Sequence, residues 1–219
     1  MIKNDYILKI IEAIGDFLKR IVELLSKEEF IDAENEMNET MQRLSGLSAD
    51  TVEVLSYEQL ISLMKLDWET GNNKCLVIGI ILTKKGDKAA LMNDTDKSCN
   101  YYFKALNILI NTFDTDVDER LTKYFSFIDY LIDKLEEYEF SLELDEKILK
   151  YYEYISRYDK AEDLLFDMLE KNNWDQSLVI SGVQFYERLL EKDEDELVNG
   201  NLPIDEVKQG IEDLKVKLT

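Results

Sequence analysis

The sequence contains no histidine among its 219 residues. This absence excludes Ser-His-Asp triads, Cys-His dyads and general acid-base catalysis by an imidazole. It also excludes zinc and di-iron sites that need an imidazole ligand, including the Glu-x-x-His motif of di-iron helix bundles. An enzyme built on this sequence would have to use tyrosine, lysine, cysteine or carboxylate chemistry.

Glycine and proline are scarce, with eight glycines and one proline in the whole chain. This scarcity argues against an all-β fold, which needs many turns, and it favours long helices joined by short connections. The chain length fits one domain or a continuous helical array that can bury a sizeable core. We therefore predict an all-α protein.

Cysteines and long apolar runs are also few. Cys75 and Cys99 are the two cysteines and lack the CxxC spacing of metal and redox sites, so we predict buried, reduced thiols. The first apolar stretch is broken by Glu12, Asp16 and Lys19, unlike a signal peptide or a membrane span. We expect a cytoplasmic protein.

Positive charge is the remaining shortage, because 26 Lys and Arg residues stand against 47 Asp and Glu residues, a net charge of −21. Residues 111–219 hold 29 of the acidic and 13 of the basic residues, and so −16 of the net charge. Such a field repels nucleic-acid phosphates and anionic lipids, so we expect neither as a partner. A basic protein or peptide would complement it; alternatively, the acidic surface only keeps the protein soluble.

The N-terminal 1–26 segment has the clearest helical pattern. Its apolar residues recur at alternating spacings of four and three, which predicts an amphipathic helix. The stripe consists of Ile7, Ile11, Ile14, Leu18, Ile21 and Leu25, widened by Ile10, Phe17 and Leu24. This arc is wider than one neighbouring helix needs, so a partner helix could pack on it as in a coiled coil; packing on the chain's own second and third helices is the alternative.

Helix ends are predicted from capping patterns and turn residues. Ser26 with Glu29 predicts a boundary between the first helix and the second, and Ser56 with Gln59 opens a later short helix. Apolar spacing predicts the remaining helices at about 29–44, within 48–72, and at 74–92, 97–113, 117–137, 143–156, 158–172 and 175–192. A last helix starts near Pro203, which suits a first helical turn.

Fragments of the tetratricopeptide repeat (TPR) pattern occur in these helices. In that pattern small residues allow two helices to approach closely and large residues fill the gaps. The best match combines Leu149 and Tyr152 with Ala161 and Leu165. A degenerate repeat is the better description, because the signature Trp and the closing Pro are missing.

Weaker matches occur elsewhere in the same register. Gly86 is followed by Ser98 and Tyr102, and Gly182 begins a further unit. We therefore predict antiparallel helix hairpins over 27–192, stacked as a TPR-like right-handed superhelical array. The whole chain, 1–219, is predicted to be a single helical-repeat domain that ends in an acidic loop and a C-terminal capping helix over 193–219.

Three segments support a resemblance to a known family. They are Asn4-Asp5-Tyr6-Ile7, residues 157–163, and Gly200-Asn201-Leu202-Pro203 with the nearby Val207 and Gly210. Across nearly its full length the sequence resembles an uncharacterised family of bacterial all-helical proteins, known mainly as a domain of unknown function. The resemblance implies the fold and a bacterial cytosolic origin, and it implies no activity from which catalytic residues could be assigned.

Two acidic segments could be taken for metal sites. Asp114, Asp116 and Asp118 resemble the start of a calcium loop, but Glu119 and Phe125 stand where that loop needs Gly and Glu. We interpret this segment as a loop with helix-capping carboxylates. The acidic run 193–196 is interpreted as a solvated turn.

Tyrosines gather in one part of the sequence, and seven of the 12 lie between residues 124 and 158. They are Tyr124, Tyr130, Tyr138, Tyr151, Tyr152, Tyr154 and Tyr158. Some could line a groove that receives a basic peptide, because tyrosine is favoured at interfaces. The alternative, which we favour, is that they pack in the core or are half-buried between helices.

No catalytic, cofactor-binding or metal-binding residue follows from these patterns, and no partner-binding residue can be assigned. Our leading hypothesis is a non-catalytic helical-repeat scaffold that binds a peptide or protein, which could carry a basic segment. The second hypothesis is a structural protein that forms a homodimer through its N-terminal helix. The third is an enzyme that works without histidine chemistry.

Overall fold

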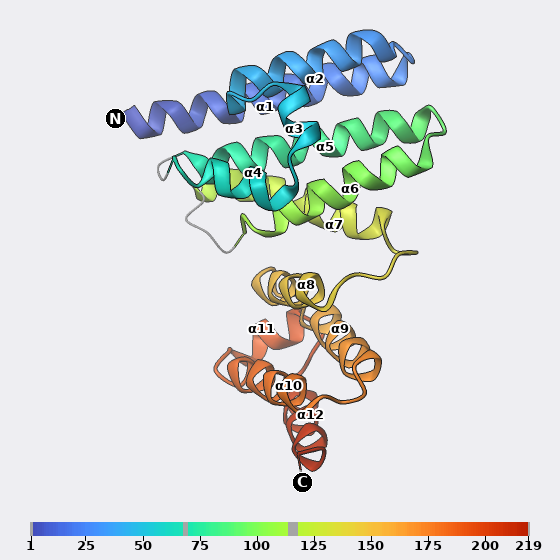
Figure 1. Ribbon diagram of the computed structural model, residues 1–219. Coiled ribbons are helices and arrows are strands. Elements are labelled where there is room, and N and C mark those ends of the chain that lie inside the picture. Colours follow the sequence, from blue (N-terminus) through green and yellow to red (C-terminus); the bar gives the residue numbers. More distant parts are fainter. Residues whose placement is uncertain (1, 68–69, 114–117, 219) are drawn as a thin grey trace. The chain divides into compact units, whose positions relative to one another are not determined.

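The computed structural model describes residues 2–67, 70–113 and 118–218 (Figure 1). In these ranges every regular element is a helix, which confirms the all-α prediction. The chain divides into two compact units, Met1–Glu139 and Phe140–Thr219, and each is described by itself. The single array over 1–219 and its TPR-like right-handed stacking stay predictions.

The N-terminal unit begins with an antiparallel hairpin of α1 and α2, followed by two short helices and the long pair α5 and α6 (Figure 1). Its elements are α1 (Ile2–Ser26), α2 (Phe30–Ser45), α3 (Ala49–Val54), α4 (Tyr57–Met64), α5 (Gly71–Leu91), α6 (Thr95–Ile110), the 3-10 helix η1 (Glu119–Phe125) and α7 (Ser126–Lys134). The most buried helix is α5, because α2, α4, α6 and α7 all pack on it.

Helix α1 is amphipathic as predicted, and its buried face lies within the predicted apolar arc. The buried residues are Ile7, Ile10, Ile14, Phe17, Ile21, Leu24 and Leu25, whereas Ile11 and Leu18 are only half-buried. Seven of the nine predicted residues are therefore buried, and the periodicity alone did not show which two lie at the edge of the buried face. Packing of α1 on α2 and α5 determines which stripe is buried.

The capping predictions had different outcomes. The box at Ser56 and Gln59 is confirmed, since each side chain accepts a hydrogen bond from the other residue's backbone N–H. The box at Ser26 and Glu29 is wrong: α2 begins after Glu29 without a side-chain cap, and the Ser26 hydroxyl donates to the carbonyl of Glu23. Helix α2 ends at Ser45, and the Gly46 that follows it has a φ of 79°, a conformation that glycine adopts without strain.

Helices α5 and α6 approach closely at Gly86. A Cβ atom at this position would lie 2.4 Å from ring atom Cε1 of Tyr102, so only glycine leaves room for the ring. The Ser98 hydroxyl donates to the Gly86 carbonyl at 3.0 Å, across the same contact. These are residues that the repeat pattern placed together, small beside large.

The helix predicted over 117–137 is wrong in its first half. Residues Glu119–Phe125 form the 3-10 helix η1, and α7 starts only at Ser126. The Asp118 side chain accepts a hydrogen bond from the backbone N–H of Arg120, which caps η1. Leu121 and Tyr124 are three residues apart and both buried, a spacing that suits three residues per turn.

The C-terminal unit is built from five helices (Figure 1). They are α8 (Leu142–Tyr154), α9 (Tyr158–Lys171), α10 (Gln176–Leu189), α11 (Glu194–Asn199) and α12 (Ile204–Val216). Helix α8 packs on α9, α10 packs on α12 and to a lesser extent on α9, and α11 contacts α12.

The acidic loop predicted near residue 193 is instead a helix. Glu194, Asp195 and Glu196 form the first turn of α11, where carboxylates interact favourably with the helix dipole, and the fully buried Leu197 anchors it. The predicted C-terminal helix is confirmed as α12, although Pro203 lies at its N-cap and not in its first turn.

Candidate functional site

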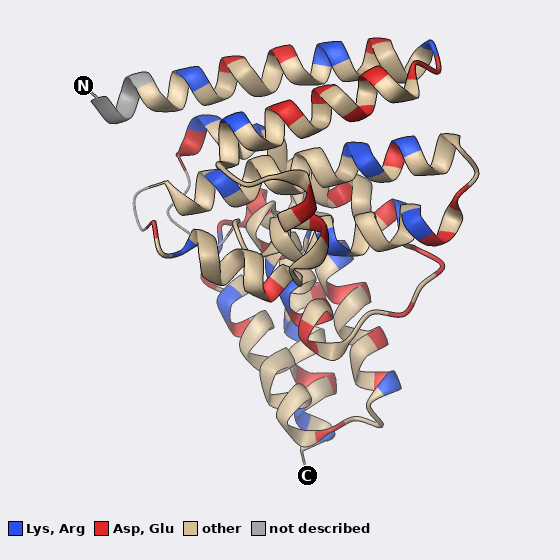
Figure 2. Ribbon diagram, turned by 45° about the horizontal axis from the view of Figure 1, so that its top comes forward, with Lys and Arg blue, Asp and Glu red and all other residues tan. Residues whose placement is uncertain are grey.

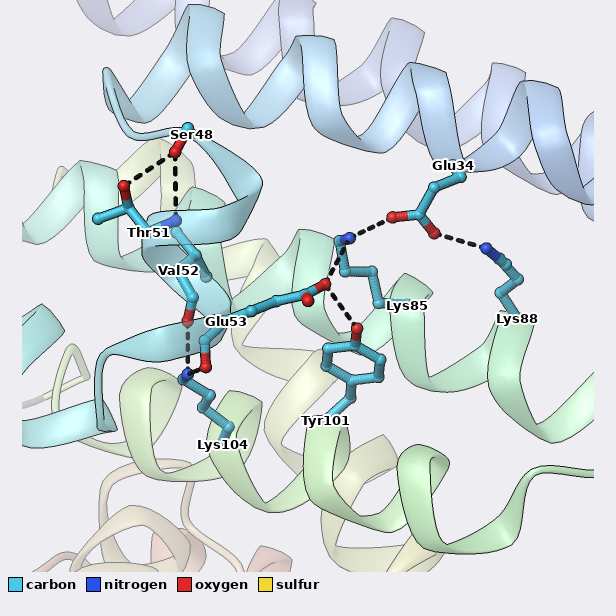
Figure 3. Close-up of polar contacts among 9 residues, drawn as sticks. All are labelled: Glu34, Ser48, Thr51, Val52, Glu53, Lys85, Lys88, Tyr101 and Lys104. Carbon is cyan, nitrogen blue, oxygen red and sulfur yellow. Dashed lines mark hydrogen bonds and ion pairs between the residues drawn. The ribbon is translucent and has the colours of Figure 1, made fainter.

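A buried lysine lies at the centre of the N-terminal unit. Lys85 on α5 is 2% exposed, and its ammonium group donates to the carboxylates of Glu34 on α2 and, at 3.3 Å, of Glu53 on α3 (Figure 3). Glu34 also bridges to Lys88, one turn further along α5, at 2.5 Å. The four charges therefore join three helices.

Both carboxylates are held ionised. Burial alone would raise the pKa of Glu34, but the hydrogen bonds from Lys85 and Lys88 outweigh it and the pKa lies below its ordinary value. At Glu53, too, burial alone would raise the pKa, but the hydrogen bond from Tyr101 and the charge of Lys85 outweigh this effect and lower the pKa below its ordinary value. An ammonium paired with two ionised carboxylates does not offer the free amine that a nucleophilic lysine needs.

Helix α6 completes the cluster. The Tyr101 hydroxyl donates to Glu53 at 2.8 Å, and burial followed by this carboxylate raises the pKa of the phenol (Figure 3). Lys104 donates to the carbonyls of Val52, Glu53 and Leu55, which caps the C-terminal end of α3. Burial lowers the pKa of Lys104.

This cluster braces the unit and offers little space for a substrate. It connects α2, α3, α5 and α6, and the hollow beside Lys85, Lys88 and Tyr101 measures only about 100 Å³. Small-molecule sites usually occupy about 300–1,000 Å³. The sequence did not indicate the cluster, because Lys85 lies in the polar run 83–88, where burial is not expected.

A second polar group surrounds Asp87, also on α5. Its carboxylate accepts hydrogen bonds from the hydroxyls of Tyr102 at 2.9 Å and Tyr130 at 2.6 Å, and it pairs with Lys84 at 2.7 Å. Burial, together with the charge of Asp87, raises the pKa of both phenols. Both hydroxyls therefore stay protonated and link α6 and α7 to α5.

The tyrosine group does not form one surface. Tyr124, Tyr151, Tyr152 and Tyr158 are buried, Tyr130 is half-buried, and Tyr138 and Tyr154 are exposed. The core or half-buried interpretation is therefore confirmed for five of the seven and wrong for the other two.

The two cysteines are free thiols in different surroundings. Cys75 is 2% exposed as predicted, and burial raises the pKa of its thiol to about 11, which suppresses its reactivity. Cys99 is only half-buried, so its predicted burial is wrong, and its thiol donates to the Tyr138 hydroxyl at 2.9 Å.

The calcium-like segment lies partly outside the described residues, which exclude Asp114 and Asp116. Asp118 caps η1, in the role that the capping interpretation gave to this segment. Within the described ranges no three carboxylate or thiol side chains are grouped so that they could hold a metal ion. No described helix combines the length and apolar character that crossing a membrane requires.

The C-terminal unit contains a hollow between α8, α9 and α10, with a volume of about 260 Å³. Its floor is apolar and consists of Leu149, Leu165, Met168 and Leu178, each less than 10% exposed. Its rim is polar and consists of Glu146, Lys150, Ser181, Gln184 and Arg188. The repeat pattern had identified Leu149 and Leu165 as packing residues but not as the lining of a hollow.

An ion pair holds two walls of this hollow together. The Arg188 guanidinium on α10 donates two hydrogen bonds, of 2.8 and 2.7 Å, to the Glu153 carboxylate on α8. The pair is bidentate, which fixes the geometry of both side chains, and the Glu153 hydrogen bonds raise the pKa of Arg188. The pair therefore links α8 to α10 beside the hollow.

Comparison with known proteins supports the family and gives no activity. No curated protein sequence matches the chain. No solved structure matches it. A family model described as a family of unknown function, DUF6483, matches residues 1–219. The chain belongs to this family of unknown function.

Proposed function

We propose that the protein is a non-catalytic binding scaffold, in which the hollow between α8, α9 and α10 receives an apolar side chain of a peptide segment. The observation that carries the proposal is the apolar floor of Leu149, Leu165, Met168 and Leu178 beneath a polar rim. An apolar anchor in a pocket, surrounded by polar groups that fix orientation, is the usual arrangement at a protein interface.

The size of the hollow favours a peptide over a cofactor. Its volume of about 260 Å³ lies below the ~300–1,000 Å³ typical of small-molecule sites. It is large enough for an anchoring side chain, whose flanking backbone would lie over the rim. Ser181 and Gln184 are exposed on the rim and can exchange hydrogen bonds with that backbone.

The charge of the unit favours basic flanks on the peptide. Residues 140–219 contain 20 acidic and 10 basic residues, a net charge of −10. The rim itself is mixed, with Glu146 and Lys150 on α8 and with Arg188 neutralised by Glu153. The surrounding field would therefore attract a basic segment, while the apolar anchor determines where it binds.

The proposal extends to the repeat architecture and the location. A TPR-like array would present this hollow on a concave face, and the contacts of Gly86 with Ser98 and Tyr102 support that kinship. Two free thiols support a reducing compartment, and we infer a cytoplasmic protein of bacterial origin.

A peptide-display selection tests the proposal. Peptides would be enriched on the full chain and counter-selected on Ser181→Trp, in which the indole fills the hollow from an exposed rim position. Glu187→Trp is the matched control, because Glu187 is exposed on the same helix and does not line the hollow.

We expect enriched peptides to contain a large apolar residue flanked by Lys or Arg. They should bind Ser181→Trp at least about tenfold more weakly than the wild type, as expected for a lost anchor, and Glu187→Trp equally well. Peptides that bind all three proteins equally would refute the proposed hollow. So would a selection that enriches nothing above background.

A further inference from the structure

Helix α1 carries a second apolar stripe that its own fold leaves largely uncovered. The stripe consists of Leu8, Ile11, Gly15, Leu18, Val22 and Leu25, each one residue after a member of the buried stripe. Leu8 and Val22 are 49% and 57% exposed, Gly15 is exposed, and Ile11 and Leu18 are half-buried. Of the six residues, only Leu25 is buried.

The geometry of this second stripe suits another helix. Its spacings alternate between three and four residues, as in the seam of a coiled coil. One residue corresponds to a rotation of about 100°, so this stripe lies about a quarter turn around the helix from the stripe that packs on α2 and α5. No atom lies within 4 Å of a Cβ built on Gly15, so a helix could approach the backbone closely there.

A hollow adjoins the C-terminal end of the stripe. It measures about 370 Å³, and its lining includes Val22 and Leu25 of α1 with Leu91 of α5. Leu91 is 52% exposed, so the uncovered apolar surface continues from α1 onto α5. An apolar side chain from a helix packed on the stripe could enter this hollow.

We propose that the second stripe binds α1 of a second copy of this chain, in antiparallel orientation. When two copies of the stripe are paired about their midpoint, Leu8 faces Leu25 of the other copy and Ile11 faces its Val22. Gly15 then faces Leu18, so a large residue fills the space above the glycine. All six positions are used, and the contact is self-complementary, as a two-fold dimer requires.

Charge complementarity selects this occupant and its direction. Glu12 and Lys19 are exposed and flank the stripe on its solvent side, where Figure 2 shows acidic and basic residues following one another along α1. In the antiparallel pair Glu12 lies beside Lys19 of the other copy, and the symmetry forms this contact twice. A parallel pair would set Glu12 level with Glu12 and Lys19 level with Lys19, which loses the complementarity.

The size of the contact predicts a weak dimer. The stripe spans ~27 Å of helix, and two such helices bury less than the ~1,200 Å² of a stable complex. We therefore expect a reversible equilibrium with a dissociation constant of about 10–100 μM.

Sedimentation equilibrium of the full chain from about 1 to about 500 μM tests this inference. The average mass should rise from 25.7 kDa towards twice that value. Val22→Glu should remain monomeric, and its fold should survive because Val22 is exposed. Val54→Glu is the matched control: Val54 on α3 is 84% exposed and lies outside the stripe, so this variant should associate like the wild type.

Charge reversal tests the direction of the pair. Glu12→Lys should weaken the dimer by about three- to tenfold, because each dimer contains the contact twice, and the addition of Lys19→Glu should restore it. A wild-type chain that is monomeric at about 500 μM, or a Val22→Glu variant that dimerises normally, would overturn the inference. A double reversal that fails to restore the dimer would overturn the antiparallel arrangement.

Discussion

Gly86 and Gly15 both lie in helix interiors, and their surroundings predict opposite effects of alanine. Alanine is better than glycine in a helix by about 0.5–1 kcal/mol, because glycine loses more conformational freedom on folding. At Gly15 nothing lies within 4 Å of the added methyl, so Gly15→Ala should stabilise the protein by about that amount.

At Gly86 the methyl would collide with Tyr102. The added Cβ lies 2.4 Å from Cε1 and 2.5 Å from Cδ1 of the ring. The ring has little freedom to move, because it is 4% exposed, its hydroxyl donates to Asp87, and it packs edge-on against Tyr130. Overpacking of a protein core costs about 1–3 kcal/mol. Because the Tyr102 ring has little freedom to move, we expect a cost in the upper half of this range, about 2–3 kcal/mol. After subtraction of the propensity gain, Gly86→Ala should lower the free energy of unfolding by about 1–2.5 kcal/mol.

Urea unfolding followed by circular dichroism measures both effects, at low micromolar concentration so that self-association does not contribute. The collision itself is tested in a Tyr102→Leu background, which lacks the ring. In this background the destabilisation caused by Gly86→Ala should be smaller by about 1 kcal/mol than in the wild-type background. The reasoning would be refuted if Gly86→Ala were as stabilising as Gly15→Ala, or if its effect were the same in both backgrounds.

Two further substitutions test the polar interior. Lys85→Met keeps the apolar stem of the side chain and removes the ammonium group. In urea unfolding at pH 7 it should destabilise the fold by about 1–3 kcal/mol, which is less than the ~3–5 kcal/mol lost when a fully buried ion pair is broken, because both carboxylates reach solvent. An unchanged stability would show that the ion pairs of Lys85 contribute nothing. Asp145 is 7% exposed and burial raises its pKa, so its ionisation opposes folding above its unfolded pKa near 3.8. Asp145→Asn should therefore stabilise the protein by on the order of 1 kcal/mol at pH 7. The gain in stability should disappear as the pH falls towards 4, because the carboxyl group of Asp145 in the native protein then becomes protonated. A gain in stability that does not depend on pH would contradict this account.

The fold class followed from the sequence because scarce glycine and proline and regular apolar spacing all favour helices. The buried face of α1 also followed except at its edge, because Ile11 and Leu18 have the same spacing as Ile10 and Phe17 but are only half-buried. Both rows are apolar, and the position of α2 and α5 decides between them. Local periodicity contains no information on that position.

Capping chemistry was predictable only where the local pattern also determined the backbone. Ser56 and Gln59 form the predicted box, whereas Ser26 is the last residue of α1 and its hydroxyl donates to the carbonyl of Glu23 in the same helix. The 3-10 helix η1 was missed because Leu121 and Tyr124 fit the apolar spacing of an α-helix equally well.

The polar cluster and the hollow depend on residues that are distant in sequence. Lys85 meets Glu34 and Glu53 from 51 and 32 residues away, so no local motif could identify the cluster. The hollow likewise requires α8, α9 and α10 to be packed before Leu149 and Leu178 share one surface. Only the repeat register indicated that these helices pack closely.

Methyl NMR of the full chain with a selected peptide tests the proposed binding site most directly. Met168 lies in the floor of the hollow, whereas Met37 and Met41 are buried in α2 of the other unit and serve as internal controls. Our account predicts that the Met168 methyl resonance shifts saturably with added peptide, that Met37 and Met41 do not, and that Ser181→Trp abolishes the shift. Saturable peptide binding that leaves the Met168 resonance unchanged would contradict it.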